Sequence, residues 1–301
     1  MSDAPSTSRP RPRAGDPGVV LGFPGQAVDV DVVCRTLARH RRDPLVAALA
    51  RACEVDDWRL VSLRERSVMQ PAIVVAGVVR ARRVSGQASL VVGHSLGEIT
   101  ALVVAGAVDE EAGLHMAMAR ERICNEAALR SPGDMVAVLG LPEHAVERLR
   151  RQIVADTQEI LDIAAVNRPE QIVLSGARRA TAKVARLAQA LGGYSVRLPI
   201  DGPYHSSLMQ AAVRPLERVV AQIDVREPAV DWMSTIDGQV HTDPDEIRTC
   251  VLDALVMPVR WARALSDIVA AGYSTMIDVG PGDALSRLHD QPGLRLQSCG
   301  S

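Results

Sequence analysis

The sequence predicts an α/β protein in which a small subdomain interrupts a large one. Apolar runs of strand length alternate with helical patterns through most of the 301 residues, which is typical of a parallel sheet covered by helices. Between 135 and 198 the order becomes strand, helix, strand, strand, helix, strand, which is the order of a ferredoxin-like unit. We therefore expect a large subdomain in 18–131 and 201–301 and a small subdomain in 132–200.

The N-terminal part of the large subdomain begins with an apolar strand. Residues 1–17 are rich in Ser, Pro and Arg and contain no apolar segment of a secretory signal, so we expect them to form a disordered arm. The expected strands are 19–23 and 90–92, and the expected helices are 30–50, 68–84, 98–105 and 110–129. Asp109 has the position and chemistry of an N-cap for the last of these helices, which ends at the breaker run 131–134.

The small subdomain follows this break. We expect strands at 135–139, 161–166, 171–174 and 195–198, with helices at 142–153 and 180–191. Residues 167–170 form the expected hairpin turn, and Gly192 ends the second helix. The alternating pattern then resumes and leads to a last strand at 275–279.

Composition excludes several classes of partner. Hydrophobic residues make up 47% of the chain, whereas aromatic residues make up 2%, too few for stacking platforms that bind nucleic acid. The formal net charge of -2 and the absence of a long apolar run give no sign of a polyanion or membrane partner. Five dispersed cysteines form neither a disulfide framework nor a zinc pattern, so we expect a cytoplasmic protein without a metal.

Gly93-His94-Ser95-Leu96-Gly97 lies between an expected strand and an expected helix. A serine on so sharp a turn needs small neighbours on both sides, and the following helix N-terminus offers free N–H groups to a developing oxyanion. This pattern makes Ser95 the candidate nucleophile.

A serine nucleophile needs a base, which is usually a histidine. His205 follows a strand and a bend at 202–204, where the chain returns from the small subdomain. The other histidines lie in polar, helical or terminal contexts typical of exposed structural positions, and His94 is expected to point to the other side of the turn. The residues alone leave open whether His205 is a base or a satisfied core histidine. Arg120 and Arg122 lie in an expected helix, and two interpretations stay open for each. The side chain is either solvated on the helix surface, or its planar guanidinium binds a carboxylate through two parallel hydrogen bonds.

An ordered set of short motifs resembles the malonyl-CoA:acyl-carrier-protein transacylases, including the acyltransferases of polyketide synthases. The resemblance runs from Val19 onward and rests on Phe23-Pro24-Gly25-Gln26, Gln70-Pro71-Ala72, Gly93 to Glu98, Arg120, Asn167 with 171–176, Tyr204-His205-Ser206, 258–261 and Gly280-Pro281-Gly282. It implies an α/β-hydrolase-like large subdomain with an inserted ferredoxin-like subdomain.

The same resemblance implies roles for individual residues. Ser95 and His205 would form a catalytic dyad, and the main-chain N–H groups of Gln26 and Leu96 would form the oxyanion hole. Arg120 would bind the free carboxylate of malonyl. The implied partners are malonyl-CoA, as the acyl donor, and an acyl carrier protein, as the acceptor. The enzyme is expected to be a monomer and to need no cofactor besides the coenzyme A thioester.

Several positions depart from the family. The loop after Gln26 is shortened, and Glu121 replaces the glycine that usually follows the arginine, where it could compete for the guanidinium of Arg120. Ala254 replaces Gln or Asn at the position whose main-chain carbonyl orients the histidine. Tyr204 would crowd a 2-methyl branch, which favours malonyl, yet its hydroxyl could bind a polar acyl group. The alternatives are an enzyme for a non-malonyl group, an acyl hydrolase, and a non-catalytic carrier-docking protein.

Overall fold

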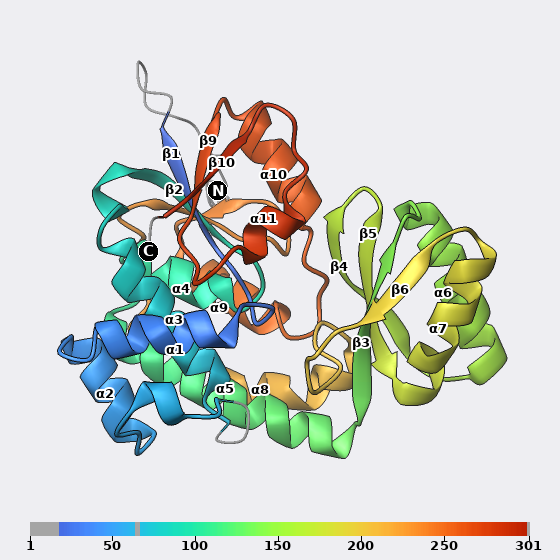
Figure 1. Ribbon diagram of the computed structural model, residues 1–301, viewed down its shortest axis with the longest axis horizontal. Coiled ribbons are helices and arrows are strands. Elements are labelled where there is room, and N and C mark those ends of the chain that lie inside the picture. Colours follow the sequence, from blue (N-terminus) through green and yellow to red (C-terminus); the bar gives the residue numbers. More distant parts are fainter. Residues whose placement is uncertain (1–17, 64–66, 300–301) are drawn as a thin grey trace, which may run out of the picture.

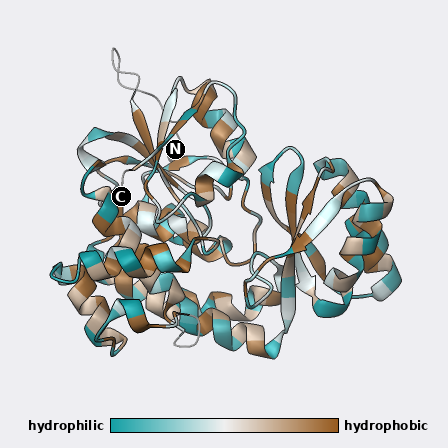
Figure 2. Ribbon diagram, viewed as in Figure 1, coloured by the Kyte–Doolittle hydropathy of each residue, from teal (hydrophilic) through white to brown (hydrophobic). Residues whose placement is uncertain are grey.

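The computed structural model describes residues 18–63 and 67–299. The expected disordered arm, 1–17, lies outside the described residues. Figure 1 shows two sheets side by side, each with its own helices, so that a large unit on one side faces a small unit on the other. In Figure 2 hydrophobic residues colour the strands at the centre of the large unit, while hydrophilic residues colour much of the outer helices.

The large sheet has six strands in the order β10-β9-β1-β2-β7-β8. Their bounds are β1 Val19–Phe23, β2 Ala88–Gly93, β7 Asp231–Met233, β8 Val240–His241, β9 Thr275–Asp278 and β10 Arg295–Ser298. All neighbouring pairs are parallel except β7 and β8. β1 and β2 lie at the centre and are buried almost throughout, as expected for strands covered on both faces.

Helices of the large subdomain surround this sheet. Their bounds are α1 Val30–Arg39, α2 Pro44–Ala52, α3 Met69–Ala81, α4 Gly97–Val104, α5 Glu110–Arg130, α8 Gln210–Val220, α9 Pro244–Asp253, α10 Trp261–Ala270 and α11 Ala284–Leu288. Single turns of 3-10 helix occupy Trp58–Leu60, Ser85–Gln87 and Ser207–Met209. The predicted cap of α5 is confirmed, because the Asp109 side chain accepts the N–H of Ala112 at 2.7 Å.

The single helix predicted at 30–50 is wrong. The structure has two helices there, separated by a turn at 40–43. Asp43 accepts the N–H of Leu45 at 2.9 Å and Pro44 occupies the first helical position, so that a new helix starts where the predicted one continues.

The small sheet has the strand order β4-β5-β3-β6 and antiparallel pairing throughout. Its elements are β3 Gly133–Leu139, α6 Glu143–Thr157, β4 Leu161–Arg168, β5 Gln171–Ala177, α7 Arg178–Ala190 and β6 Tyr194–Arg197. Both helices lie on the outer face of the sheet (Figure 1). This element order and strand order confirm the ferredoxin-like prediction.

The two faces of the small sheet bury different cores. Val138 and Leu174 pack with α6 and α7 in a separate hydrophobic cluster. Ala137 and Val173 point the other way and belong to the main core shared with the large subdomain. The open side of the small sheet therefore forms one wall of the region where the two subdomains meet. In the described ranges, no helix has the length and apolar character needed to cross a membrane.

Candidate active site

The Ser95 turn joins the end of β2 to the start of α4. Ser95 has φ +55°, a left-handed conformation that a non-glycine residue adopts only when its surroundings impose it. A Cβ on Gly93 would lie 2.1 Å from the Glu98 nitrogen, and one on Gly97 would lie 2.1 Å from the Phe23 carbonyl oxygen. The two glycines therefore let β1, the turn and α4 approach closely, as the sequence predicts.

Gly97→Ala is expected to destabilise the protein by about 2–4 kcal/mol, because the added methyl meets rigid main chain and something must shift. The matched control is Gly86→Ala, since a Cβ at Gly86 meets nothing within 4 Å. Thermal and urea unfolding of both variants measure the difference. Equal unfolding midpoints for the two variants would contradict the close approach at Gly97.

The structure brings Ser95 and His205 together. Ser95 Oγ lies 2.6 Å from His205 Nε2, although the two residues are 110 positions apart. On the other side of the ring, His205 Nδ1 lies 3.0 Å from the carbonyl oxygen of Met257. The prediction that the carbonyl of Ala254 orients this histidine is wrong: the chain turns after α9, so that the carbonyl of Met257, three residues later, faces the ring.

These contacts fix how His205 titrates. Because a carbonyl only accepts, Nδ1 carries the hydrogen and donates to Met257, which leaves the Nε2 lone pair free to receive the Ser95 proton. Burial and the nearby Arg120 guanidinium lower the pKa of His205 to about 3. His205 also has φ +58°, so both members of the pair are held in left-handed backbone.

One predicted oxyanion amide, that of Leu96, follows the nucleophile in the chain, and the other, that of Gln26, lies in a loop beside the nucleophile turn. A Cβ on Gly25 would be 3.4 Å from Ser95 Cβ, so the loop that contains Gln26 packs against the turn. Within the described ranges, the N–H groups of Gln26 and Leu96 donate to no main-chain carbonyl. Leu96 immediately precedes α4, whose N-terminal dipole adds positive potential at this point.

Arg120 lies inside the protein rather than on a solvated helix face, and only 4% of it is exposed. Its Nη1 donates to Gln70 Oε1 at 2.5 Å, and its guanidinium carbon lies 5.7 Å from the centroid of the Tyr204 ring. Among the described residues, no carboxylate forms an ion pair with Arg120. A buried guanidinium held by a neutral amide keeps charge and donors available for an anionic ligand.

Glu121 does not compete for Arg120. Its carboxylate accepts the N–H of Met69 at 3.2 Å and of Gln70 at 2.8 Å, which are the first two N–H groups of α3. Val68, the N-cap residue of α3, provides no side-chain cap, and Glu121 caps these N–H groups from α5. Burial raises the pKa of Glu121.

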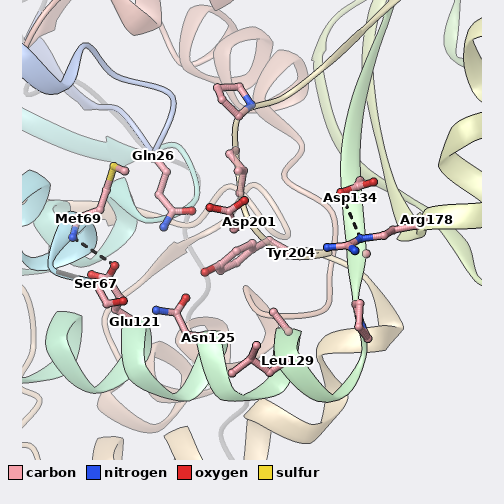
Figure 3. Close-up of a pocket in the computed structure, with 16 residues that line it drawn as sticks. Gln26, Ser67, Met69, Glu121, Asn125, Leu129, Asp134, Arg178, Asp201 and Tyr204 are labelled. Atoms are coloured by element: carbon pink, nitrogen blue, oxygen red, sulfur yellow. Dashed lines mark hydrogen bonds and ion pairs between the residues drawn. The ribbon is translucent and has the colours of Figure 1, made fainter. Parts of the chain in front are cut away.

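Tyr204 and Glu121 line a pocket of about 360 Å³ between the two subdomains. Figure 3 shows the Tyr204 ring near its centre, with Gln26, Glu121 and Asn125 on one side and Asp134 and Arg178 on the other. The Tyr204 hydroxyl accepts from Gln70 Nε2 at 3.3 Å, and burial raises its pKa, so it stays protonated. Tyr204 therefore contacts Arg120 with its ring and also lines this pocket.

His94 faces away from the dyad, as predicted. Its Nε2 lies 2.8 Å from Asn167 Oδ1, and its ring packs edge-on against Trp261 at 5.5 Å. The sequence predicts Asn167 in a hairpin turn, but β4 continues through Arg168 and holds Asn167 as a strand residue. His94 therefore links the Ser95 turn to the small subdomain.

Sequence reasoning missed two contributors to the site. The sequence presents Gln70 only as part of a motif, because its contact with Arg120 depends on the packing of α3 against α5. The carbonyl of Met257 leaves no signal in the sequence, because every residue type supplies the same acceptor.

Comparison with known proteins places the site in context. A model of the family described as "Acyl transferase domain" matches residues 52–298. The malonyl CoA-acyl carrier protein transacylase of Escherichia coli (strain K12) is 30% identical over 88% of this chain and 90% of that protein. The Bacillus subtilis (strain 168) protein of the same name is 31% identical, and the match covers 68% of this chain and 65% of that protein.

Solved structures give the same picture. The malonyl CoA-acyl carrier protein transacylase of Coxiella burnetii superposes with a TM-score of 0.84 at 27% identity, covering 98% of this chain and 95% of that chain. A malonyl-transacylase in complex with a type II PKS acyl-carrier protein also gives a TM-score of 0.84, at 25% identity, over 93% of this chain and 95% of that one.

Proposed function

The chain belongs to the acyl transferase domain family, and we propose that it transfers a malonyl group from coenzyme A to the phosphopantetheine thiol of an acyl carrier protein. The observation that carries this proposal is the 2.6 Å contact between Ser95 Oγ and a neutral, buried His205, near Arg120, which forms no ion pair with the described residues. Such a pair activates a serine for acyl transfer, and the arginine selects a carboxylate-bearing acyl group.

In the first half-reaction, Ser95 takes the acyl group. His205 Nε2 accepts the hydroxyl proton while the serine oxygen attacks the thioester carbonyl, and the N–H groups of Gln26 and Leu96 stabilise the resulting oxyanion. The carbon–sulfur bond then breaks, and His205 returns the proton to the coenzyme A sulfur. The products are the malonyl ester of Ser95 and free coenzyme A.

In the second half-reaction, the carrier thiol replaces coenzyme A. His205 accepts the thiol proton, the sulfur attacks the ester carbonyl, and the proton passes to Ser95 Oγ as the ester bond breaks. Throughout both steps Arg120 holds the malonyl carboxylate, so the acyl carbonyl stays at the oxyanion amides. The reaction needs no cofactor besides the thioester.

The partner and the setting follow from this proposal. A relative in complex with its acyl-carrier protein supports a carrier as acceptor, in fatty-acid or polyketide synthesis. We propose that the enzyme acts in the cytoplasm as a monomer.

Intact-protein mass spectrometry tests the proposal directly. Protein mixed with malonyl-CoA should gain the mass of one malonyl group. After a carrier protein bearing phosphopantetheine is added, the enzyme should lose this mass and the carrier should gain it. Loss of the adduct as free malonate, with none on the carrier, would instead indicate a hydrolase. Absence of any adduct would indicate a non-catalytic docking protein.

Arg120→Ala is expected to lower the second-order rate constant for malonyl-CoA loading by about 10²- to 10³-fold, because a buried charge-assisted interaction with the carboxylate is lost. Loading of acetyl-CoA, which lacks the carboxylate, should not fall. Arg122→Ala is the matched control, since Arg122 lies on the same helix but is exposed and pairs with Glu126 at 3.0 Å. Unchanged malonyl loading by Arg120→Ala would remove Arg120 from the carboxylate site.

A further inference from the structure

The position of His205 depends on the chain segment between α9 and α10. The His205 N–H donates to the carbonyl of Leu255 at 3.0 Å, and Nδ1 donates to the carbonyl of Met257 at the same distance. Three residues further, the Arg260 N–H donates to the carbonyl of Thr235 at 2.8 Å. Thr235 is thus an anchor for the segment that holds the base.

Thr235 is itself fixed to the nucleophile turn. Its N–H donates to Glu98 Oε1 at 2.7 Å, and its hydroxyl lies 2.8 Å from the same oxygen and 3.2 Å from the Gly93 carbonyl. The Ser234 hydroxyl also donates to Glu98 Oε1, at 3.2 Å. Gly93 and Glu98 flank Ser95, one at the end of β2 and the other in the first turn of α4.

This connection is buried and therefore stiff. Glu98 is 2% exposed, and Ser234 and Thr235 are fully buried. Three donor groups surround one oxygen of Glu98, an arrangement that suits an ionised carboxylate. Its other oxygen, Oε2, makes no hydrogen bond with the described residues. In a low-dielectric interior, such contacts are strong when made and costly when broken.

The charge on Glu98 changes near neutral pH. Burial raises the pKa of Glu98 to about 7, while hydrogen bonds from Thr235 and Ser234 oppose the rise. Asp237 faces Glu98 and raises its pKa further. The negative charge of Glu98 in turn helps to raise the pKa of the Cys250 thiol in α9. Glu98 is therefore protonated and a weaker hydrogen-bond acceptor below about pH 7, and ionised and a stronger acceptor above it.

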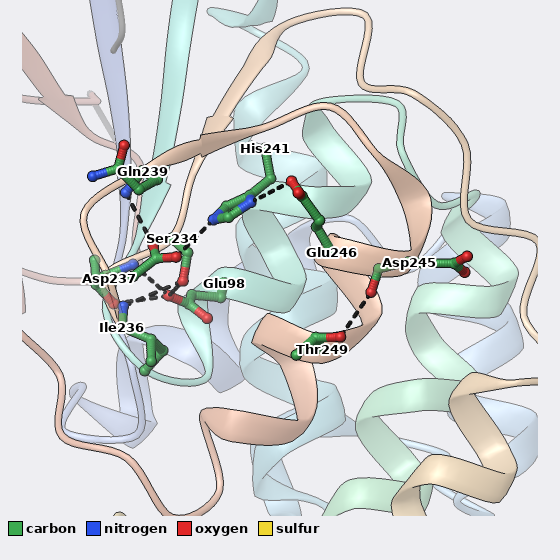
Figure 4. A network of polar contacts seen from close by, with 10 residues as sticks. Glu98, Ser234, Ile236, Asp237, Gln239, His241, Asp245, Glu246 and Thr249 are labelled. Atoms are coloured by element: carbon green, nitrogen blue, oxygen red, sulfur yellow. Dashed lines mark hydrogen bonds and ion pairs between the residues drawn. The ribbon is translucent and has the colours of Figure 1, made fainter. Parts of the chain in front are cut away.

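His241 lies beside this group (Figure 4) and is buried, so the expectation that it is exposed is wrong. Its Nε2 lies 2.9 Å from Asp237 and its Nδ1 3.0 Å from Glu246. Burial lowers the pKa of His241, but hydrogen bonds to Asp237, Cys250 and Glu246 outweigh it and raise the pKa to about 11. Ligand atoms of Asp237, His241 and Cys250 lie within 4.8 Å of one another. Because each ring nitrogen of His241 already faces a carboxylate, we interpret this group as an ion-pair network.

We propose that Glu98 and Thr235 are positioning residues, which hold the Ser95 turn in register with the segment that aims His205 at Ser95 Oγ. Neither side chain belongs to the dyad, the oxyanion amides or the carboxylate site. This inference rests on the proposed function only for its malonyl readout, because activation of Ser95 can be measured without malonyl. Its consequence is that losing the Thr235 hydroxyl or the Glu98 charge slows acylation without weakening substrate binding.

Thr235→Val removes the hydroxyl and keeps the size and the main-chain contacts. We expect the maximal acylation rate constant in quench-flow to fall by about 10- to 100-fold, as expected for a small misplacement of reacting groups, with half-saturating malonyl-CoA unchanged. Thr235→Ser, which restores the hydroxyl, should recover the rate to within about twofold. The matched control is Thr181→Val, a buried threonine of α7 whose hydroxyl also donates to main-chain carbonyls.

Glu98→Gln keeps an acceptor for Thr235 and removes the charge. In the wild-type enzyme we expect the maximal acylation rate constant to rise between about pH 6 and about pH 8, as Glu98 ionises. In Glu98→Gln the rate constant should be lower at pH 8 by about tenfold and independent of pH in this range. Unfolding midpoints of all variants, measured at each pH, separate slow acylation from loss of folded protein.

A fluorophosphonate that phosphonylates active-site serines distinguishes the two proposals. If the wild-type protein reacts with the fluorophosphonate but gains no malonyl, the proposed function fails, while the labelling rates of the variants still test positioning. Slower labelling of Thr235→Val and Glu98→Gln, rescued in Thr235→Ser, supports positioning. Wild-type rates of labelling and acylation in folded Thr235→Val, or the wild-type pH dependence in Glu98→Gln, would overturn it. A rise in half-saturating malonyl-CoA at unchanged maximal rate would also overturn it.

Discussion

Ser95→Ala is expected to abolish formation of the malonyl adduct and to lower carrier loading by about 10⁴-fold or more. The reason is that the acyl group travels on Ser95 Oγ, so its removal deletes the covalent intermediate rather than weakening a contact. Malonyl-CoA binding should remain within a few-fold of wild type, because Arg120 and the amides of Gln26 and Leu96 are unchanged. Intact mass, carrier loading and equilibrium binding measure the three quantities.

A matched serine makes this result specific. Ser286→Ala removes an exposed hydroxyl from α11 and should leave both adduct and loading unchanged. An adduct that persists in Ser95→Ala would place the acyl group on another residue. Binding lost together with the adduct would mean that Ser95 holds the turn as well as the acyl group, which thermal unfolding of the variant would reveal.

The parts of the structure that the sequence predicts best are those fixed by local chemistry. β1 has the predicted bounds, and the strand, serine turn and helix around Ser95 follow from an apolar run followed by two glycines with rigid steric roles. The ferredoxin-like unit follows from the order of its elements, because few arrangements of that order bury one face of each helix.

The parts that the sequence does not predict depend on distant contacts. The Gln70 amide that holds Arg120 lies 50 residues away from it, and the Glu98 carboxylate meets Thr235 across 137 residues. No periodic pattern in the sequence predicts either pair, because each contact depends on how the packed elements cross. The choice of Ala254 over Met257 fails for a related reason: main-chain carbonyls look alike in sequence, and the turn after α9 selects among them.

The sequence does contain a signal for the break between α1 and α2. Asp43-Pro44 is a helix-start signal, in which the aspartate caps and the proline begins a new helix. The apolar pattern of 30–50 continues across it and predicts a single helix. Local capping chemistry therefore outweighs periodicity at this position.

His205→Ala is expected to lower the acylation rate constant by about 10⁴-fold, because a serine without its base is a poor nucleophile. Malonyl-CoA binding should persist, as in Ser95→Ala. His115→Ala, which changes an exposed histidine of α5, is the matched control and should retain wild-type rates. Acylation by His205→Ala above about one hundredth of the wild-type rate would mean that another group accepts the serine proton.

The same variant gives a pH signature of known sign. Burial lowers the pKa of His205 to about 3, well below the 6.5 of an ordinary histidine, so the unfolded chain binds this proton more readily than the native protein. The neutral ring therefore contributes stability above pH 6.5, and that contribution is lost as the pH falls toward 3. Urea unfolding should show stability decreasing less steeply over this range in His205→Ala than in the wild-type protein. Because the ring stays neutral down to about pH 4, its protonation adds no acid limb to acylation near pH 7, and a step there must come from another group. An identical pH dependence of stability in the two proteins would show that His205 has the same pKa in the native and unfolded states, and would contradict the lowering of this pKa by burial.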